Sequence, residues 1–457
     1  MYEPGWTSLL PPLLAIGLAL WSRQVYLALA GGIWLGATLL AGGNPLSGLA
    51  DAIESIIAVL GNAGDARVIA FTLLIGALIA TIEASGGVRG FIGWLESRRW
   101  GNSGKRAQWL AFFSGIVIFI ESNITVLVAG TVARPLIDRY RVAREKLAYI
   151  IDSTSAPICI LIPLNAWGAF NLSLLGNLDV DNPLGVFAES ISMNFYAWFA
   201  VGLTALVIAF NWNIGPMREA EARAASQDPV SESDKETEGG KAINMVLPLI
   251  VLITTMPLGL WITGEGNLAQ GSGSTSVLWA VLAALACTWL LVLGQRQMNV
   301  SQLMDIFLEG AGRLLPMAII LLLALALGDT AKALGTGPWV ASQIPQDLAA
   351  SLLLPAVFLS SAFIAFSVGS SWGTFAIMIP IAIPAGMALG LPPAPFLAAV
   401  LSGGIFGDHS SPISDTTVIS SLASGSDHIA HVRTQLPYAL LAGGCATAAF
   451  AMLGMSI

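Results

Sequence analysis

Charged residues are scarce in this chain of 457 residues, because Asp, Glu, Lys and Arg make up only 11% of it, against about 25% in an average soluble protein. Hydrophobic residues account for 55%, and the mean hydropathy is +0.76. This composition excludes a large soluble domain. Apolar runs of about 20 residues, the length that crosses about 30 Å of hydrocarbon, recur along the sequence. We therefore expect an all-α polytopic protein that crosses the cell (inner) membrane many times.

Cysteine and histidine are rare, with three residues of each. Cys159, Cys287 and Cys445 lie singly in apolar segments without the paired spacing of a metal site, so we expect neither disulfides nor zinc. The isolated Cys and His residues also offer no nucleophile or metal constellation of an enzyme, and no cofactor is expected. The net charge of −8 gives no reason to expect a nucleic-acid partner. Broad apolar surfaces are compatible with a homodimer but do not predict one.

The N-terminus has no basic residue before its first apolar run and no small-residue cleavage pattern, so we interpret 6–22 as a first membrane helix and not as a signal peptide. Much of the acidity lies in the polar segment 215–243, which is typical of a flexible linker on the cytoplasmic side. It divides the chain into a first membrane repeat, 1–214, and a second, inverted repeat, 244–457.

Three short similarities connect these halves in the same order, at a spacing of about 250 residues. LADAIESI at 49–56 corresponds to LMDIFLEG at 303–310. ESNIT, from Glu121 to Thr125, corresponds to SSWGT, from Ser370 to Thr374, and both contain Ser-x-x-Thr. DSTSAPI, which starts at Asp152, corresponds to DHSSPI, which starts at Asp408. In transporters, such order is the trace of an internal structural repeat.

The positive-inside rule keeps Lys and Arg of short loops in the cytoplasm and so orients the chain. Two basic clusters flank the apolar run 109–133, and both stay inside only if the run folds back at Glu121 to Thr125. We therefore expect a re-entrant hairpin at about 109–138, where irregular backbone lines a cavity. In this topology only Arg67 and Lys332 of the 20 Lys and Arg lie outside.

Each repeat is expected to contain about five membrane helices and one re-entrant hairpin. The expected segments of the first repeat are 6–22, 25–42, 67–86, the hairpin at about 109–138, a broken helix at about 147–173, and 195–213. Those of the second are 244–263, 276–293, 314–330, a hairpin at about 349–389, a broken helix at about 396–425, and 434–455.

The second broken helix contains the sequence GDHSSPISDTTVISS, in which Asp408, His409 and Asp415 lie among hydroxyl residues. A loop outside the membrane is the alternative, but the flanks PFLAAVLSGGIF and VISSLA are apolar. Ionisable residues at membrane depth mark ion or substrate paths. Hard oxygen ligands suit a sodium ion, and the broken helices bring such ligands to the midplane. The predicted sodium ligands are Asp152, Ser153, Thr154, Asp408, Ser410, Ser411, Asp415 and Thr416.

The hairpin tips and neighbouring polar or aromatic positions complete the predicted path for substrate or protons. A carboxylate at membrane depth can hold either a proton or an ion, and such competition is sufficient for antiport. The residues assigned to this path are Glu121, Ser122, Asn123, Thr125, Asn165, Ser371, Trp372, Thr374 and His409.

The segment GDHSSPISDTT, followed by DHIAHVRTQLPYAL, resembles the C-terminal signature of the NhaC-type sodium/proton antiporter family, within the ion transporter superfamily. The resemblance implies inverted repeats with re-entrant hairpins. SNIT at 122–125 is also similar to the Ser-Asn-Thr hairpin motif of sodium-coupled carboxylate transporters in that superfamily. The second hairpin departs from that motif, because Trp372 stands where the motif has Asn.

Two transport functions remain open. A sodium/proton antiporter is favoured by the buried carboxylates and by the lack of an intramembrane Arg or Lys that would bind an organic acid. A sodium-coupled transporter of a small organic solute, such as an amino acid or a carboxylate, is favoured by Asn165, Trp167, Asn171 and Trp372. Helix N-termini can bind a substrate carboxylate without a basic side chain. A passive channel fits the discontinuous helices less well.

Several ionisable residues have simpler interpretations. Glu83 and Asp329 lie near the ends of related segments, where a carboxylate that reaches water is as good an account as a proton path. His409 is interpreted either as a pH sensor or as a neighbour that positions Asp408. His428 and His431 fall at the expected cytoplasmic end of a helix, and we interpret them as solvated.

Overall fold

The computed structural model describes residues 5–22, 24–91, 103–119, 122–162, 165–178, 180–226, 240–267, 271–343 and 350–457. Within these ranges the regular structure is helical, and no strand occurs. The described helices of the first half are η1 (Trp6–Leu9), α1 (Leu10–Ser22), α2 (Val25–Leu40), α3 (Pro45–Gly61), α4 (Ala63–Ala84), α6 (Gly104–Val117), α7 (Ser122–Arg139), α8 (Arg144–Ser153), α9 (Ala156–Leu161), α10 (Ala166–Gly176), α11 (Pro183–Ser192), α12 (Phe195–Phe210) and α13 (Pro216–Ser226). Those of the second half are α14 (Ile243–Thr263), α15 (Gly273–Gly294), α16 (Val300–Ala333), α17 (Thr336–Gln343), α18 (Ala350–Val368), α19 (Ser371–Ala388), α20 (Pro393–Ser410), α21 (Asp415–Ser424) and α22 (His428–Gly454).

Side chains typical of helix N-caps begin several of these helices. Asn62 precedes α4 and accepts hydrogen bonds from two amides of its first turn. Asn299 forms a capping box with Gln302 at the start of α16, and Asp427 caps α22. These caps satisfy amides that have no partner inside a helix. Helix starts are therefore encoded locally, even in a chain dominated by apolar residues.

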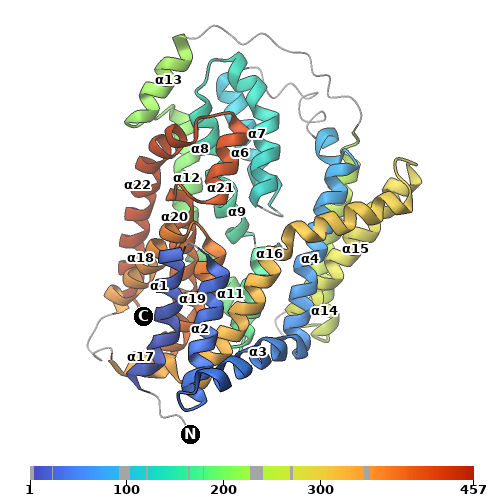
Figure 1. The fold of residues 1–457 in the computed structure, drawn as a ribbon. Coiled ribbons are helices and arrows are strands. Elements are labelled where there is room, and N and C mark those ends of the chain that lie inside the picture. Colours follow the sequence, from blue (N-terminus) through green and yellow to red (C-terminus); the bar gives the residue numbers. More distant parts are fainter. Residues whose placement is uncertain are drawn as a thin grey trace.

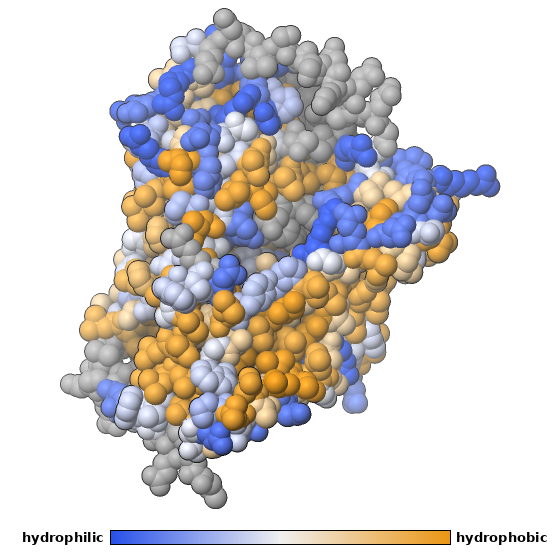
Figure 2. Space-filling view, viewed as in Figure 1, coloured by the Kyte–Doolittle hydropathy of each residue, from blue (hydrophilic) through white to orange (hydrophobic). Residues whose placement is uncertain are grey.

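Eight helices among the described residues are long and apolar enough to cross a membrane, and the number rises to ten if each of two bent pairs forms one span. In Figure 2 hydrophobic residues cover much of the lower half of the visible face, while hydrophilic residues gather towards the upper end. An apolar surface of that extent is the outside of a protein surrounded by lipid. The expected polytopic all-α membrane protein is confirmed.

Two details differ from the expected segments. α3 is a separate helix that bends by 119° from α2, and the expected span 314–330 is the second part of the 34-residue α16. The two similar segments LADAIESI and LMDIFLEG lie in α3 and in the first part of α16, with exposed acidic side chains at Asp51, Glu54, Asp305 and Glu309. Helices with one polar face follow a membrane surface readily, and an apolar-run search does not detect them.

The helices form two groups that Figure 1 separates clearly. On one side, α4 packs against both α15 and α16, and α14 packs against α15. On the other side lie the helix pairs α6–α7 and α18–α19, the broken helices α8–α10 and α20–α21, and the long helices α12 and α22. α10 contacts α4, α15 and α16, so the first broken helix joins the two groups.

In both halves of the chain a helix pair precedes a broken helix. The pair α6–α7 turns between residues 117 and 122, and the pair α18–α19 turns at Gly369 and Ser370. The first broken helix is interrupted after Ser153 and again before Ala166, and the second between Ser410 and Asp415. These positions coincide with the expected hairpins and breaks. Their inverted orientation and the assignment of 215–243 to the cytoplasm remain predictions.

Candidate functional site

The tips of the two helix pairs share the predicted Ser-x-x-Thr pattern. Thr125 donates its hydroxyl to the carbonyl of Ile118, across the first turn. Thr374 donates to the carbonyl of Ser370 over 3.0 Å, and the Ser370 side chain caps α19. Ser122, Ser371 and both threonines are buried. Glu121 and the side chain of Asn123, which were also predicted here, lie outside the described part of the structure.

Each tip or its helix packs directly against the break that follows in the chain. A Cβ atom added at Gly115 of α6 would lie 2.2 Å from Oγ1 of Thr154. A Cβ atom added at Gly369 would lie 2.7 Å from the carbonyl oxygen of Ile413. Contacts this close require the absence of a side chain. The helix pairs therefore fix the geometry of both breaks.

Asn165 holds the first break by its amide. Its nitrogen lies 2.8 to 3.0 Å from the carbonyl oxygens of Phe119, Cys159 and Ile162, which share its two hydrogens, and its oxygen accepts from the amide of Gly168. The predicted path residue Asn165 thus connects the first tip to the start of α10. With its amide nitrogen and oxygen engaged in this way, its role in the structure is to position the break.

Asp152 lies one residue before the end of α8 and is 1% exposed. Its Oδ2 accepts a hydrogen bond from Nε2 of Gln435 at 2.7 Å and one from Oγ1 of Thr417 at 3.4 Å. Its Oδ1 accepts no hydrogen bond from the described residues, and the buried hydroxyl of Ser420 lies near this carboxylate. One oxygen of a buried carboxylate is therefore available to a ligand at the C-terminal end of a half-helix, which favours positive charge.

Asp408 lies near the end of α20, is 1% exposed, and has a different set of partners. Oγ of Ser414 donates to Oδ1 over 2.8 Å, and Oγ of Ser371 donates to Oδ2 over 3.3 Å. Ser371 belongs to the second tip and Ser414 to the second break. Both oxygens of this carboxylate are thus held by hydroxyl groups.

His409 connects the two broken helices. Its Nε2 lies 3.1 Å from Oγ of Ser153 and 3.9 Å from Oδ2 of Asp152, while its Nδ1 lies 2.6 Å from the hydroxyl of Tyr196 in α12. The ring is 3% exposed. His409 of the second broken helix thus bonds to the first broken helix, and it follows Asp408 directly in the chain.

The remaining predicted ligands divide into buried and exposed groups. Ser410 is buried, and its hydroxyl has no hydrogen-bond partner among the described residues. Ser411 donates to the carbonyl of Phe366, and Thr416 lies 3.0 Å from the hydroxyl of Ser414. Asp415 is exposed at the first residue of α21, where its Oδ1 accepts from the amide of Thr416. The structure does not place Asp415 among the buried carboxylates.

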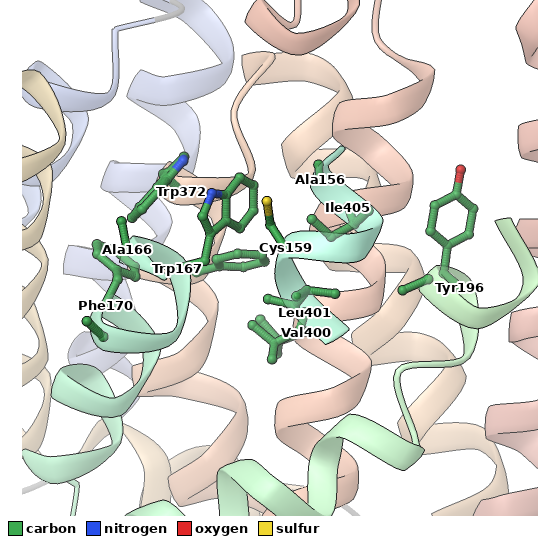
Figure 3. Packing of buried hydrophobic residues seen from close by; sticks show 14 of the residues in the cluster. Ala156, Cys159, Ala166, Trp167, Phe170, Tyr196, Trp372, Val400, Leu401 and Ile405 are labelled. Carbon is green, nitrogen blue, oxygen red and sulfur yellow. The ribbon is translucent and has the colours of Figure 1, made fainter. Parts of the chain in front are cut away.

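Aromatic side chains form a wall beside the first break. The ring centroids of Trp167 and Trp372 are 4.9 Å apart, and Phe170 meets Trp372 edge to face at the same separation. Figure 3 shows α9, with Cys159, between the indole of Trp167 on one side and Tyr196 on the other. Nε1 of Trp167 and the amide of Asn171 are buried and have no hydrogen-bond partner among the described residues.

Some important residues were missed or misjudged from the sequence. Thr417, Ser414, Tyr196 and Gln435 all contact the carboxylates or His409, but isolated hydroxyls and a helical Gln carry no sequence signal. The interpretation of His431 as solvated is wrong, because the ring is fully buried and contacts Oε1 of Gln435 at 2.8 Å. α22 turns that face of its first turns inward, and a sequence does not show which face a helix buries.

Two further observations bear on ligands. A pocket of about 680 Å³ lies between the starts of α4, α11 and α15, with buried Asp65 in its lining. Asp65 accepts hydrogen bonds from Ser173 of α10 and from Asn177, which follows the end of that helix. In the described ranges, no group of three or more His, Cys, Asp and Glu residues is placed to hold a metal ion. The carboxylate network is thus built from hydroxyls and amides and differs from a transition-metal site.

Comparison with known proteins identifies the relatives of this chain. The profile of the Na+/H+ antiporter family matches residues 177–455, which is more than half of the sequence. An uncharacterised protein of Haemophilus influenzae is 32% identical over 98% of this chain and 91% of its own length. The malate-2H+/Na+-lactate antiporter of Bacillus subtilis is 37% identical over 108 residues, which cover 22% of this chain and 23% of that protein.

The crystal structure of the Alcanivorax borkumensis YdaH transporter has the same overall fold, with a TM-score of 0.61 at 16% identity over 90% of each chain. The family match includes the second broken helix with GDHSSPISDTT and therefore confirms the resemblance found in the sequence. The many apolar helices, the shared fold and this match agree that the chain belongs to the Na+/H+ antiporter family and is a multi-pass secondary transporter.

Proposed function

We propose that this protein exchanges sodium ions for protons across the cell (inner) membrane, and that the carboxylates of the two broken helices form the exchange site. The observation that carries the proposal is the burial of Asp152 at the end of a half-helix, where one of its oxygens accepts no hydrogen bond from the described residues. No Lys or Arg is among its described hydrogen-bond partners.

Burial makes exchange the natural chemistry of this carboxylate. An ionised carboxylate in a low-dielectric interior costs several kcal/mol unless an opposite charge or several hydrogen bonds compensate it. At Asp152 a proton or a cation can supply that compensation, and the two exclude each other at one oxygen. Competition for a single site, together with access from alternate sides, is sufficient for antiport.

The oxygen ligands around the breaks suit sodium. Sodium is a hard cation that prefers carboxylate, hydroxyl and carbonyl oxygens. Ser410 supplies a buried hydroxyl without a hydrogen-bond partner among the described residues, and Ser153 and Thr154 supply buried hydroxyls beside Asp152. Asp408, with its Ser371 and Ser414 partners, supplies the second negative charge. The C-terminal ends of α8 and α20 add favourable dipoles.

Alternating access is supported by the close contact between tips and breaks. Because Gly115 and Gly369 leave no space against Thr154 and Ile413, a movement of either helix pair must move the break it touches. Such coupling would open the site to one side at a time. In discontinuous-helix transporters the site lies near the midplane, where half-helix ends meet.

The test uses the full chain in proteoliposomes with a pH-sensitive dye inside and no organic solute. An external pulse of sodium is expected to raise the internal pH, because protons leave as sodium enters. A pulse of potassium is expected to leave the internal pH unchanged. A variant with both Asp152→Asn and Asp408→Asn should be silent. Asp305→Asn, which removes an exposed carboxylate of α16, should match the wild type. A wild type without sodium-driven proton movement would refute sodium/proton antiport.

A second candidate, sodium-coupled transport of a small organic anion, is favoured by the aromatic wall. Nε1 of Trp167 and the Asn171 amide are buried without partners among the described residues, and such groups suit a polar solute. The malate-2H+/Na+-lactate antiporter of Bacillus subtilis, a partial relative, exchanges organic acids by its name. Sodium-dependent uptake of radiolabelled malate or lactate in the same proteoliposomes, absent in Trp372→Ala, would support this function over plain antiport.

A further inference from the structure

We propose that His428, Ser421 and His431 form a proton-binding site that is separate from the carboxylates and coupled to Asp152 through Gln435. This inference deepens the proposed antiport, on which its coupling part rests. The three residues lie where α21 meets the start of α22. Oγ of Ser421 lies 3.0 Å from Nδ1 of His428, 2.9 Å from Nδ1 of His431, and 2.8 Å from the carbonyl oxygen of Thr417.

The hydrogen-bond partner of each Nε2 atom shows whether that nitrogen carries a hydrogen. Nε2 of His428 lies 2.7 Å from the carbonyl oxygen of Pro412, which only accepts hydrogen bonds. Nε2 of His431 lies 2.8 Å from Oε1 of Gln435. The orientation of that amide is fixed, because its nitrogen faces two acceptors, Oδ2 of Asp152 at 2.7 Å and the carbonyl of His409 at 2.6 Å. Both imidazoles therefore carry a hydrogen on Nε2.

The number of hydrogens available for the contacts of the Ser421 hydroxyl shows where an added proton would bind. A neutral imidazole has one N–H, so both Nδ1 atoms lack a hydrogen when the rings are neutral. The single hydroxyl hydrogen of Ser421 then serves only one of three neighbouring acceptors. One added proton completes the chain, because one imidazole donates to Ser421 while Ser421 donates to the other. The geometry thus holds one shared proton better than none.

The site reaches from solvent to the interior. His428 is partly exposed, whereas Ser421 and His431 are buried. Around the entrance, Arg144 of α8 donates to the carbonyl of Gly425, and Asp427 caps α22. A polar pocket of about 280 Å³ lies beside these residues. Its lining also includes Asp138 of α7, Glu145 of α8, and Arg223 of α13. Because His428 follows Asp427 in the chain and is the partly exposed member of the cluster, it is the residue through which protons would enter.

The remaining charged neighbours complete the electrostatic environment. The Arg134 side chain of α7 packs against Gly425, and Arg433 lies with Glu219 of α13 in a second surface pocket. On the interior side, Asp152 and the ring of His409 lie beyond Gln435. The carboxylate of Asp152 is therefore the nearest described negative charge on the buried side of the cluster.

The positive charge of a proton on the two imidazoles would couple this cluster to the carboxylate of Asp152. A proton on the pair places a positive charge two hydrogen bonds from Asp152, through His431 and Gln435. That charge compensates the carboxylate when no cation is bound and opposes a sodium ion at the same carboxylate. By reciprocity, sodium binding must then favour release of the proton. The cluster would thus contribute a proton to the exchange without sharing a ligand with sodium.

The test is a titration of the purified full chain labelled with ¹⁵N-histidine, followed by NMR as the pH is lowered. The ring shifts should show one imidazole of the pair gaining a second proton, and sodium chloride, but not potassium chloride, should remove it. His431→Gln keeps a donor towards Gln435 but binds no extra proton, so this signal should vanish. In Ser421→Ala the hydroxyl that joins the two Nδ1 atoms is absent, so the signal of the shared proton should be lost.

Ser424→Ala is the matched control, since Ser424 is a buried hydroxyl of the same helix that donates to the carbonyls of Ser420 and Ser421, accepts from the amide of Ser426 and bonds to neither imidazole. It should behave as the wild type. Two neutral imidazoles throughout the titration would overturn the proton site. An imidazole pair that gains its proton but ignores sodium would retain the site and refute its coupling, and a silent dye assay in that case would identify the proposed antiport as the part that failed.

Discussion

Asp152 and Asp408 occupy corresponding positions in DSTSAPI and DHSSPI, near the ends of α8 and α20, yet their surroundings differ. Hydroxyl groups donate to both oxygens of Asp408, whereas only Oδ2 of Asp152 accepts hydrogen bonds from the described residues. The partners of Asp408 come from its own half of the chain. Those of Asp152, Thr417 and Gln435, come from the opposite half.

This difference suggests a division of labour between the two halves. A carboxylate whose two oxygens both accept hydrogen bonds is held in place and contributes negative charge. A carboxylate with one unbonded oxygen can exchange a ligand without breaking an existing hydrogen bond. Similar sequence segments therefore have unequal chemistry, because each break is completed by side chains from outside DSTSAPI and DHSSPI.

The largest expected effect separates the two carboxylates. Asp152→Asn should weaken sodium binding by about 100-fold, since loss of a charged ligand costs about 3 kcal/mol. Asp408→Asn should weaken it by only about 10-fold, because Ser371 and Ser414 can rotate to pair with the new amide. Isothermal titration calorimetry with sodium chloride on the single variants measures both. Equal losses would break the proposed division of labour.

A smaller effect is expected at the two glycines that fit the tips to the breaks. Gly369→Ala should destabilise the protein by about 2–3 kcal/mol, because φ is +71° and a backbone carbonyl lies in the way. Gly115→Ala should cost less, about 1–2 kcal/mol, because the added methyl meets Oγ1 and Cβ of Thr154 while the helix gains propensity from Ala. Thermal unfolding in detergent compares them with Gly202→Ala, whose Cβ meets nothing within 4 Å. A reversed order would show that the first break is the more rigid.

The smallest effect is expected at Asp415. Its exposed carboxylate is screened by solvent, so Asp415→Asn should change the half-maximal sodium concentration for proton flux by less than about twofold. The dye assay in proteoliposomes measures this directly, with Asp408→Asn alongside. A loss as large as that of Asp408→Asn would return Asp415 to the exchange site, and the second half would then carry two functional carboxylates.

Local patterns predicted the breaks and the tips well. Asp, hydroxyls and Pro clustered inside apolar runs marked both broken helices, and Ser-x-x-Thr marked both turns. Pro alone is not sufficient, because α14, α18 and α19 continue through their prolines. Asp152, Asp408 and Ser410 were found in this way and are buried. The short apolar helices and the bent pair α2–α3 were described less well, since a hydropathy window does not register a change of direction.

The amino-acid sequence by itself determined that this chain crosses the membrane many times, where its helices break, and which family it belongs to, because apolar length and interrupting residues act locally. Only the tertiary structure decided that Asp415 is exposed, that Gln435 reaches Asp152, and that His431 is buried against Ser421. Those contacts join residues that are remote in the sequence or depend on which face a helix turns inward. Packing between helices sets both, and no local pattern encodes it.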